Sequence, residues 1–458
     1  MKAKTKQPNN NDKMISMPVV NPHAAGIDIG SSSHLVYVSQ DNVKEFGVFT
    51  SDLYNIVSHL QAHEIKTVSL ESTGFYWQAL FVILQDSGFE VYLVNARHLK
   101  NVKGHKTDVI DCRWLQLTHS IGLLSNSFQP GAFTHKLRCY VRHRKSIVED
   151  ASRFISKMDK LLVLMNIQLS NVLRDITCES GLKVIEAILR GEREPQKLEG
   201  LISQHCKSSR QDILKALTVD WRQEYLFELK NCYELYNFYW EKIRTLDNEI
   251  EILLKAHSVQ SKQNQTKSTK NFKIFQKKQH QKNDPQFKVE QYAVQMTDGV
   301  DLLQIDGVGI NTIMTIMTET GFDLTGKFPT AMHFASWLGF TPNRKISGGK
   351  KLSSRTRKKT NPLAKIIRDA ANAAGNSQSR LGDFFERLAY RKGRMVAINA
   401  TARKIAVVIY NMLANKQEFC SQFSAEERDR VKAHNIKNAL KVLQSYNISK
   451  NEFDLQLT

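Results

Sequence analysis

The sequence contains few cysteines, and none in a disulfide or metal-binding arrangement. Its six cysteines lie far apart and form no Cys-x-x-Cys pair, which argues against a disulfide framework or a zinc knuckle and fits a reducing compartment. Long apolar runs are also missing, because none approaches the ~20 residues of a membrane span. Residues 1–20 are rich in Lys, Asn and Gln and lack the apolar core of a signal peptide. We therefore expect a cytoplasmic protein with no membrane partner.

Acidic residues are outnumbered by basic ones. The 458 residues include 65 Lys and Arg against 45 Asp and Glu, which gives a formal net charge of +20. The composition is otherwise ordinary, with 41% hydrophobic and 24% charged residues, and the length is typical of about three domains. Such an excess of positive charge favours a polyanionic partner, and the commonest one inside a cell is nucleic acid.

The N-terminal part has the pattern of a mixed α/β domain. Residues 1–22 are expected to form a disordered arm. Short apolar runs at 25–30 and 34–38 then predict a β-hairpin or adjacent strands, and further strand and helix patterns follow up to a helix that begins at Asp108. Strands followed by strand–helix alternation predict an α/β domain over residues 23–135.

The remainder is predicted to be mainly helical. Two apolar seams with heptad-like spacing, from Ile147 to Val172 and from Leu229 to Leu253, predict a helical coiled-coil region over residues 136–257. The seams either cover each other in an intramolecular helical hairpin or join two chains in a dimerising coiled coil, and the sequence leaves both open. We expect a Lys/Gln-rich insertion or linker at 258–290, a mainly helical C-terminal domain at 291–420 and a peripheral tail at 421–458.

Four acidic residues are candidate metal ligands. Asp28 lies in an apolar strand, where a carboxylate is costly unless it is paired or binds a metal ion. Glu71 ends another predicted strand. It could face Asp28 if the two strands are neighbours, but a lone acid at a strand end is more often a solvated residue. Asp108 and Asp111 share one helix face, where they repel each other unless a cation lies between them. The alternative for this pair is a first helical turn capped by Thr107, where acids are favoured.

Taken together, these four acids favour metal-dependent chemistry. Four carboxylates suit the hard cations Mg²⁺ or Mn²⁺, and a pair of such ions suits phosphodiester cleavage. The Gly-Ile-Asp-Ile-Gly segment around Asp28 also resembles the first strand and phosphate loop of an actin-like kinase, which would bind a nucleotide instead. That kinase interpretation requires a second phosphate loop and an adenosine motif, and neither is convincingly present.

The C-terminal half contains the candidate residues for contacting nucleic acid. Gly307 and Gly309 form a turn typical of helix–hairpin–helix units, whose backbone N–H groups approach DNA phosphates; a purely structural turn is the alternative. Ser347 precedes two glycines within residues 344–368, which carry ten basic residues and no acid. Cations there would stabilise charge that develops on a phosphate. The candidate nucleic-acid ligands are Gly307, Gly309, Arg344, Lys345, Lys350, Lys351, Arg355, Arg357, Lys358 and Lys359.

Several motifs in a fixed order resemble one transposase family. Gly-Ile-Asp-Ile-Gly, Glu-Ser-Thr-Gly-x-Tyr-Trp and Asn-Ala-Arg-His-x-Lys-Asn-Val-x-Gly-x-Lys-Thr-Asp-x-x-Asp are similar to the N-terminal DEDD domain of the insertion-sequence one-ten transposases, relatives of the Piv DNA invertase. Ile-Asp-Gly-Val-Gly, Phe-Ala-Ser-Trp-Leu-Gly-Phe-Thr-Pro and Ser-Gly-Gly-Lys resemble the C-terminal transposase domain of the same family. The resemblance covers most of residues 23–415. Ile346 and Cys112 depart from the usual pattern, but neither removes a proposed catalytic group.

The resemblance implies both a fold and a reaction. The implied fold is an RNase H-like, RuvC-type domain, a coiled-coil region and a C-terminal domain with a nucleophilic serine. The implied protein is a bacterial, nucleoid-associated recombinase that acts on donor and target DNA, is guided by a structured bridge RNA, and works as a dimer or tetramer. The implied catalytic residues are Asp28, Glu71, Asp108, Asp111 and Ser347, with Mg²⁺ or Mn²⁺ held by the four acids. A Holliday-junction-type nuclease that uses water as its nucleophile, and a non-catalytic nucleic-acid binder, are the competing interpretations.

Overall fold

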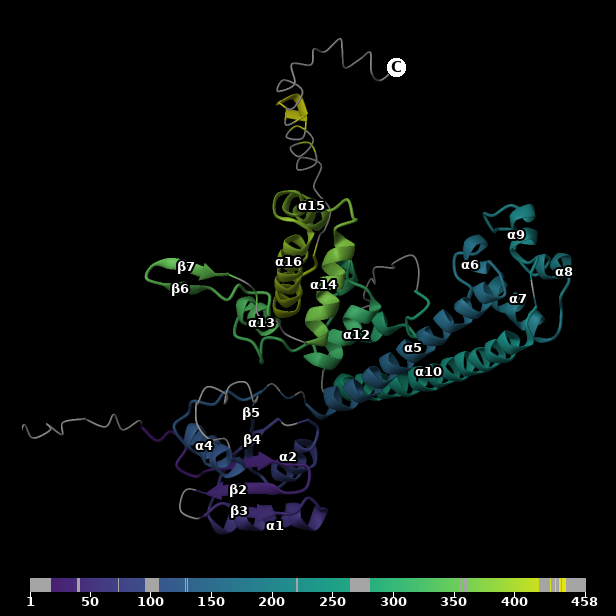
Figure 1. Cartoon of the computed structure of the whole chain (residues 1–458). Helices are drawn as coiled ribbons and strands as arrows, with labels where there is room; N and C mark the ends of the chain where they lie inside the picture. The colour runs from purple at the N-terminus through teal and green to yellow at the C-terminus, as the bar shows by residue number, and fades with distance from the viewer. Residues whose placement is uncertain are drawn as a thin grey trace, which may run out of the picture. The chain divides into compact units, whose positions relative to one another are not determined.

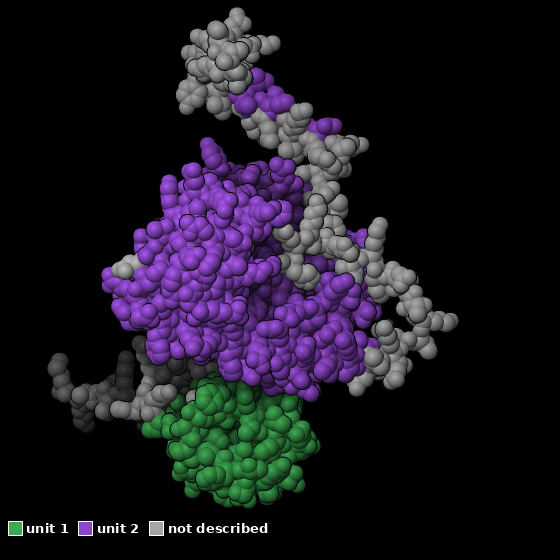
Figure 2. Space-filling model, turned by 90° about the vertical axis from the view of Figure 1, so that its right-hand side faces the viewer, with its two compact units in different colours: residues 1–129 green, residues 130–458 purple. Residues whose placement is uncertain are grey.

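The protein divides into two compact units, residues 1–129 and residues 130–458, which are described separately (Figures 1 and 2). The structure, a computed structural model, describes residues 18–38, 42–72, 74–94, 107–127, 129, 131–219, 221–263, 281–354, 356, 361–419, 429, 433, 436, 437 and 439–441. Residues 1–17 of the expected arm, the core of the Lys/Gln-rich insertion and most of the expected tail therefore lie outside the described residues.

The first unit is a five-stranded sheet with helices packed on it. Its elements are β1 (Ala24–Ile29), β2 (His34–Val38), β3 (Lys44–Phe46), α1 (Thr50–Ala62), β4 (Thr67–Glu71), α2 (Trp77–Asp86), β5 (Glu90–Val94) and α4 (Asp108–Ser120). The strand order is β3-β2-β1-β4-β5. The first three strands pair antiparallel, whereas β1, β4 and β5 are parallel neighbours. The predicted mixed α/β fold and its hairpin, in which Ile29 pairs with His34, are confirmed.

The central strand β1 is covered on both faces. Ala25 and Ile27 belong to the apolar core that α1 and α2 share with the sheet. Gly26 faces α4 instead, since a Cβ built on it would lie 2.6 Å from the carbonyl oxygen of Cys112. Because successive side chains of a strand point to opposite faces, Asp28 shares the face of Gly26 and points to the side of α4.

The second unit is mainly helical. Its elements are α5 (Ala132–Leu164), α6 (Leu169–Val172), α7 (Glu179–Leu189), α8 (Pro195–Glu199), α9 (Arg210–Ala216), α10 (Gln223–Gln263), α11 (Val289–Met296), the 3-10 helix Leu302–Gln304, α12 (Ile310–Glu319), α13 (Ala331–Trp337), β6 (Lys345–Ser347), β7 (Lys350–Ser353), α14 (Pro362–Ala374), α15 (Arg380–Lys392) and α16 (Arg394–Asn415).

The two long helices α5 and α10 run side by side (Figure 1). Ile147 and Ala151 of α5 are buried against Ile243 of α10, and a buried ion pair joins Arg144 to Asp247 across the same interface. The two predicted apolar seams therefore cover each other within one chain, which corresponds to the intramolecular hairpin. The dimerising coiled coil stays a prediction.

Helices α11 to α16 share an apolar core, to which Leu137 of α5 and Ile250 and Leu254 of α10 also belong. Helix α16 is long and apolar enough to cross a membrane, but half of its most apolar stretch is buried in this core. A core helix passes the same test of length and composition, and Ile405 and Ile409 of α16 are fully buried among the neighbouring helices. Burial of this kind accounts for the apolar sequence of α16.

Two segments expected to be irregular are held at their ends, one by hydrogen bonds and the other by helices. Val20 and Asn21, in the expected arm, both donate backbone hydrogen bonds of 2.8 Å to the Ser120 carbonyl at the end of α4. Helix α10 extends to Gln263 and α11 begins at Val289, so both helices reach into the stretch 258–290 that was expected to be a linker.

Candidate active site

Asp28 and Glu71 lie at the ends of adjacent parallel strands. Ile27 of β1 pairs with Leu70 of β4, so the two acids follow one residue later on neighbouring strands. Both side chains are half-buried. The sequence predicted that Glu71 would face Asp28 if its strand were a neighbour of β1, and the sheet order provides that arrangement.

The other two acids lie in the first turn of α4. Thr107 caps this helix, because its hydroxyl accepts a hydrogen bond of 3.3 Å from the backbone N–H of Ile110. Asp108 is exposed and Asp111 is half-buried. The positive end of the helix dipole favours carboxylates in this turn, so the capping interpretation holds locally and the two acids are well placed there.

A row of polar side chains that was not predicted from the sequence fixes α4 on the sheet. The Cys112 thiol donates to the Gly26 carbonyl at 3.2 Å, the Gln116 amide donates to the Ala24 carbonyl at 3.2 Å, and the His119 ring lies 2.9 Å from a threonine hydroxyl of β4. Burial raises the pKa of Cys112 to about 12, so the thiol remains a protonated donor. The signal was present in the sequence, because Cys112, Gln116 and His119 recur at helical spacing.

The four acids form one electrostatic cluster. Burial raises the pKa of Asp28 to about 6, and the negative charges of Glu71, Asp108 and Asp111 add to the rise. The backbone N–H of Ile29 opposes the shift by donating to the carboxylate. Three carboxylates that are far from Asp28 in the sequence thus repel its negative charge. A bound cation would relieve this repulsion.

The donor chemistry of this cluster fits a divalent cation, although the carboxyls do not converge. Among the described residues, no group of three or more His, Cys, Asp or Glu side chains is close enough to hold a metal ion. The negative charges of the other three carboxylates nevertheless raise the pKa of Asp28. The four carboxylates supply the oxygen donors that Mg²⁺ or Mn²⁺ prefers, but they do not converge on one point.

Ser347 lies at the tip of a β-hairpin in the second unit. It ends β6 and pairs directly with Lys350, which begins β7. Gly348 and Gly349 between them have φ values of +54° and +76°, the left-handed geometry of a two-residue hairpin turn. Ser347 and Lys350 are both exposed, so a hydroxyl and a cation share the open end of the hairpin.

The eight basic residues among the predicted nucleic-acid ligands divide into three groups. Arg344 is exposed near the start of the hairpin, like Lys350. Lys345 and Lys351 lie in the paired strands. Four more predicted ligands lie outside the described residues: Arg355, Arg357, Lys358 and Lys359.

The two glycines of the predicted helix–hairpin–helix turn have different surroundings. Gly307 has a φ of +82°, and a Cβ built on it would lie 2.0 Å from the Ala370 carbonyl oxygen of α14. Gly309, directly before α12, has nothing within 4 Å of such a Cβ. The purely structural turn therefore accounts for Gly307 without any phosphate, whereas no contact among the described residues accounts for Gly309.

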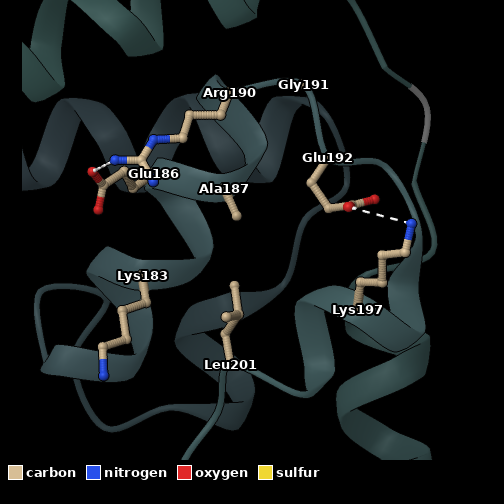
Figure 3. A pocket seen from close by; sticks show the side chains of 8 residues that line it. All are labelled: Lys183, Glu186, Ala187, Arg190, Gly191, Glu192, Lys197 and Leu201. Atoms are coloured by element: carbon tan, nitrogen blue, oxygen red, sulfur yellow. Dashed lines mark hydrogen bonds and ion pairs between the residues drawn. The ribbon is translucent and has the colours of Figure 1, made fainter.

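A pocket between α7 and α8 is a poor phosphate site. It has a volume of about 560 Å³ and is lined by residues of both charges (Figure 3). Arg190 pairs with Glu186 at 2.5 Å, Lys197 lies 3.7 Å from Glu192, and Lys183 pairs with a glutamate one helical turn earlier. Its cations are already neutralised by carboxylates.

Comparisons with known protein families match both the region of the four acids and the region of Ser347. Residues 25–167 match the DEDD family model of IS110 transposases, described as a transposase, and residues 301–386 match the model described as the transposase IS116/IS110/IS902 family. The first match contains the four acids and the second contains Ser347. A search of curated proteins found no match.

The fold and these matches define a DNA transposase, an enzyme that recombines DNA, with an RNase H-like N-terminal domain. The chain belongs to the IS110 family of transposases. The predicted family, its enzyme class and DNA as its partner are thereby confirmed, and the family implies the use of a divalent metal ion.

Proposed function

We propose that this transposase is an RNA-guided recombinase of a bacterial insertion sequence, which cuts and rejoins DNA through a phosphoserine intermediate at Ser347. The cluster of acids that raises the pKa of Asp28 carries the proposal. It gathers negative charge from two strands and a helix onto one face of the first unit, as metal-dependent phosphodiester chemistry requires.

The acids Asp28, Glu71, Asp108 and Asp111 would hold Mg²⁺ or Mn²⁺. When bound, such ions activate the scissile phosphate as Lewis acids and neutralise part of its charge. The protein contributes the fixed position of the carboxylates. Gly26 and Cys112 hold α4 against β1 and thereby set where Asp108 and Asp111 lie relative to Asp28.

The Ser347 hydroxyl is the proposed nucleophile. Its Oγ forms a bond to phosphorus while the bond from phosphorus to the leaving deoxyribose oxygen breaks, and the serine proton ends on that oxygen. Rejoining runs the exchange in reverse with a deoxyribose hydroxyl of another strand, and the serine recovers its proton. Lys350, directly opposite Ser347, stabilises the negative charge that develops on the phosphate.

Sequence recognition is assigned to RNA and assembly to a homo-oligomer. The net charge of +20 and the family support a stable complex with a structured guide RNA that pairs with donor and target DNA. The proposed reaction requires the acids and the serine at the same phosphate, although the acids belong to the first unit and the serine to the second. A dimer or tetramer would allow two chains to share this task.

The central experiment is the trapping of a covalent protein–DNA adduct. The purified protein, its copurified RNA and a labelled donor DNA are incubated with Mg²⁺, denatured and separated by gel electrophoresis. We expect an adduct with the wild type and with Ser354→Ala, a nearby exposed serine that serves as the matched control. Ser347→Ala should fold and bind RNA normally but give no adduct and no strand exchange.

The same experiment separates the competing functions. DNA cleavage without any adduct would favour a junction nuclease that uses water. An adduct that maps to Ser353 or Ser354, or that persists in Ser347→Ala, would refute the assignment of the nucleophile. Recombination that continues after complete RNase digestion would refute RNA guidance.

A further inference from the structure

The turn between α15 and α16 gathers positive charge on the second unit. We define the α15–α16 basic face by six cations: Arg380, Arg387, Arg391, Lys392, Arg394 and Lys404. Only two acids, Asp383 and Glu386, occur between residues 380 and 404. Arg387, Arg391, Lys392, Arg394 and Lys404 are exposed. This region is separate from the hairpin that carries Ser347.

The exposed cations of this face have no carboxylate partner among the described residues. Arg387 and Arg391 donate to backbone carbonyls one helical turn earlier, at 3.1 and 3.4 Å. Arg394 donates to the Asn372 side chain at 2.8 Å. The Lys404 ammonium lies over the Phe384 ring, 4.6 Å from its centre. Their charges are therefore held in place without being neutralised.

Three of these cations repel one another across the two helices. Partial desolvation of its ammonium lowers the pKa of Lys404, and the charges of Arg387 and Arg380 lower it further. Arg380, Arg387 and Arg391 are seven and four residues apart, so they follow one ridge of α15. The cations in the pocket of Figure 3 differ, since each of them has a glutamate partner.

An exposed aromatic ring lies within this charge. Tyr390 is 94% exposed, the highest value among the exposed large hydrophobic side chains that the structure describes. It directly precedes Arg391 and Lys392, and Met395, 71% exposed, follows after the turn. An aromatic ring without apolar cover, flanked by cations, has the composition of a base-stacking platform.

We propose that the α15–α16 basic face binds unpaired RNA, with its arginines and lysines on successive phosphates and Tyr390 stacked on a base. The ring favours RNA over duplex DNA, because bases in a duplex are already stacked and do not offer their faces. The inference rests on the proposed function only in naming the guide RNA as the occupant. It makes no use of Ser347 or of the four acids.

The test measures binding of two fluorescein-labelled probes, an oligouridine and a duplex DNA, to the full-length chain by fluorescence anisotropy over a range of salt concentrations. Arg387→Gln/Arg391→Gln should weaken oligouridine binding about tenfold and reduce the log–log salt slope by about 1.4, since a single strand contributes about 0.7 for each phosphate contact. Tyr390→Ala should weaken oligouridine binding about tenfold and leave duplex binding unchanged.

The matched control is Lys183→Gln/Arg190→Gln, which removes the same charge from the ion-paired pocket of Figure 3. It should leave both affinities and both salt slopes unchanged. Oligouridine binding that is unchanged in the α15 pair, or reduced equally in the control, would overturn the inference. Loss of duplex binding alone would overturn the choice of RNA. These binding measurements do not depend on whether an adduct forms at Ser347. The trapping experiment therefore tests the proposed function separately.

Discussion

The backbones of Gly26 and Cys112 touch. The Cys112 thiol donates a 3.2 Å hydrogen bond to the Gly26 carbonyl, and the Cys112 carbonyl lies 2.6 Å from where a Cβ of Gly26 would be. This contact joins the strand that carries Asp28 to the helix that carries Asp108 and Asp111. The relative positions of the candidate acids therefore depend on a residue without a side chain.

Gly26→Ala should unfold the first unit more easily and abolish recombination. The new methyl group would meet the Cys112 carbonyl and also the Gln116 backbone nitrogen, which lies 2.5 Å away, and neither backbone atom can move alone. Overpacking of this kind destabilises by roughly 1–3 kcal/mol. Chemical denaturation and a recombination assay measure the two effects. Gly131→Ala is the control, because no atom lies within 4 Å of its Cβ position and its φ is −61°.

Asp108→Asn/Asp111→Asn should abolish recombination and leave nucleic-acid binding largely intact. The substitutions remove two of the four carboxylates but no cation, and binding depends on Lys and Arg. Recombination in a plasmid assay and RNA affinity of the same preparations provide the measurements. Glu45→Gln/Asp86→Asn removes two exposed acids from the same unit and should behave like the wild type. Normal recombination by the Asp108/Asp111 variant would exclude a metal site at these residues.

Asp28→Asn should stabilise the protein at neutral pH and lose this advantage in acid. The pKa of Asp28 is about 6 in the folded chain, above the ordinary value of 3.8, so the native state takes up a proton between these values and the unfolded state does not. Stability contributed by this group is greatest below pH 4 and falls as pH rises through 6. After allowance for solvent screening we expect about 1 kcal/mol at pH 7.

Melting temperatures of the wild type and of Asp28→Asn across this pH range test the sign. A difference that stays constant with pH would contradict a raised pKa. Added Mg²⁺ should raise the melting temperature of the wild type at pH 7 by binding the native state, and should have a smaller effect on Asp28→Asn.

Gly307→Ala and Gly309→Ala should separate packing from nucleic-acid binding. Gly307→Ala puts a methyl group against the Ala370 carbonyl at a φ of +82°, so it should destabilise the second unit by a few kcal/mol. Gly309→Ala meets no atom and should fold normally. Thermal unfolding and DNA binding of both variants are measured. Unchanged DNA binding by folded Gly309→Ala would remove this turn from the proposed DNA contacts.

Local structure was predictable from the sequence where it depends on near neighbours. Thr107 was recognised as a helix cap because its hydroxyl and the N–H that it accepts from are three residues apart. The two glycines after Ser347 were visible in the sequence, and they form the turn of a β-hairpin. Helix α15, Arg380–Lys392, lies in the C-terminal domain that was expected to be mainly helical, since its apolar period is local.

The sequence by itself determined which residue types are available and the segments in which they lie: four acids, a serine between cations, and two apolar seams. Only the tertiary structure decided that the face of Gly26 receives α4, so that four distant carboxylates raise the pKa of one aspartate. It also decided that Gly307 packs against α14, that Arg144 of α5 pairs with Asp247 of α10, and that Arg387 and Arg391 have no carboxylate partner among the described residues. Periodicity and capping depend on residues within one or two turns, whereas burial and charge pairing depend on residues that the chain brings together only after folding.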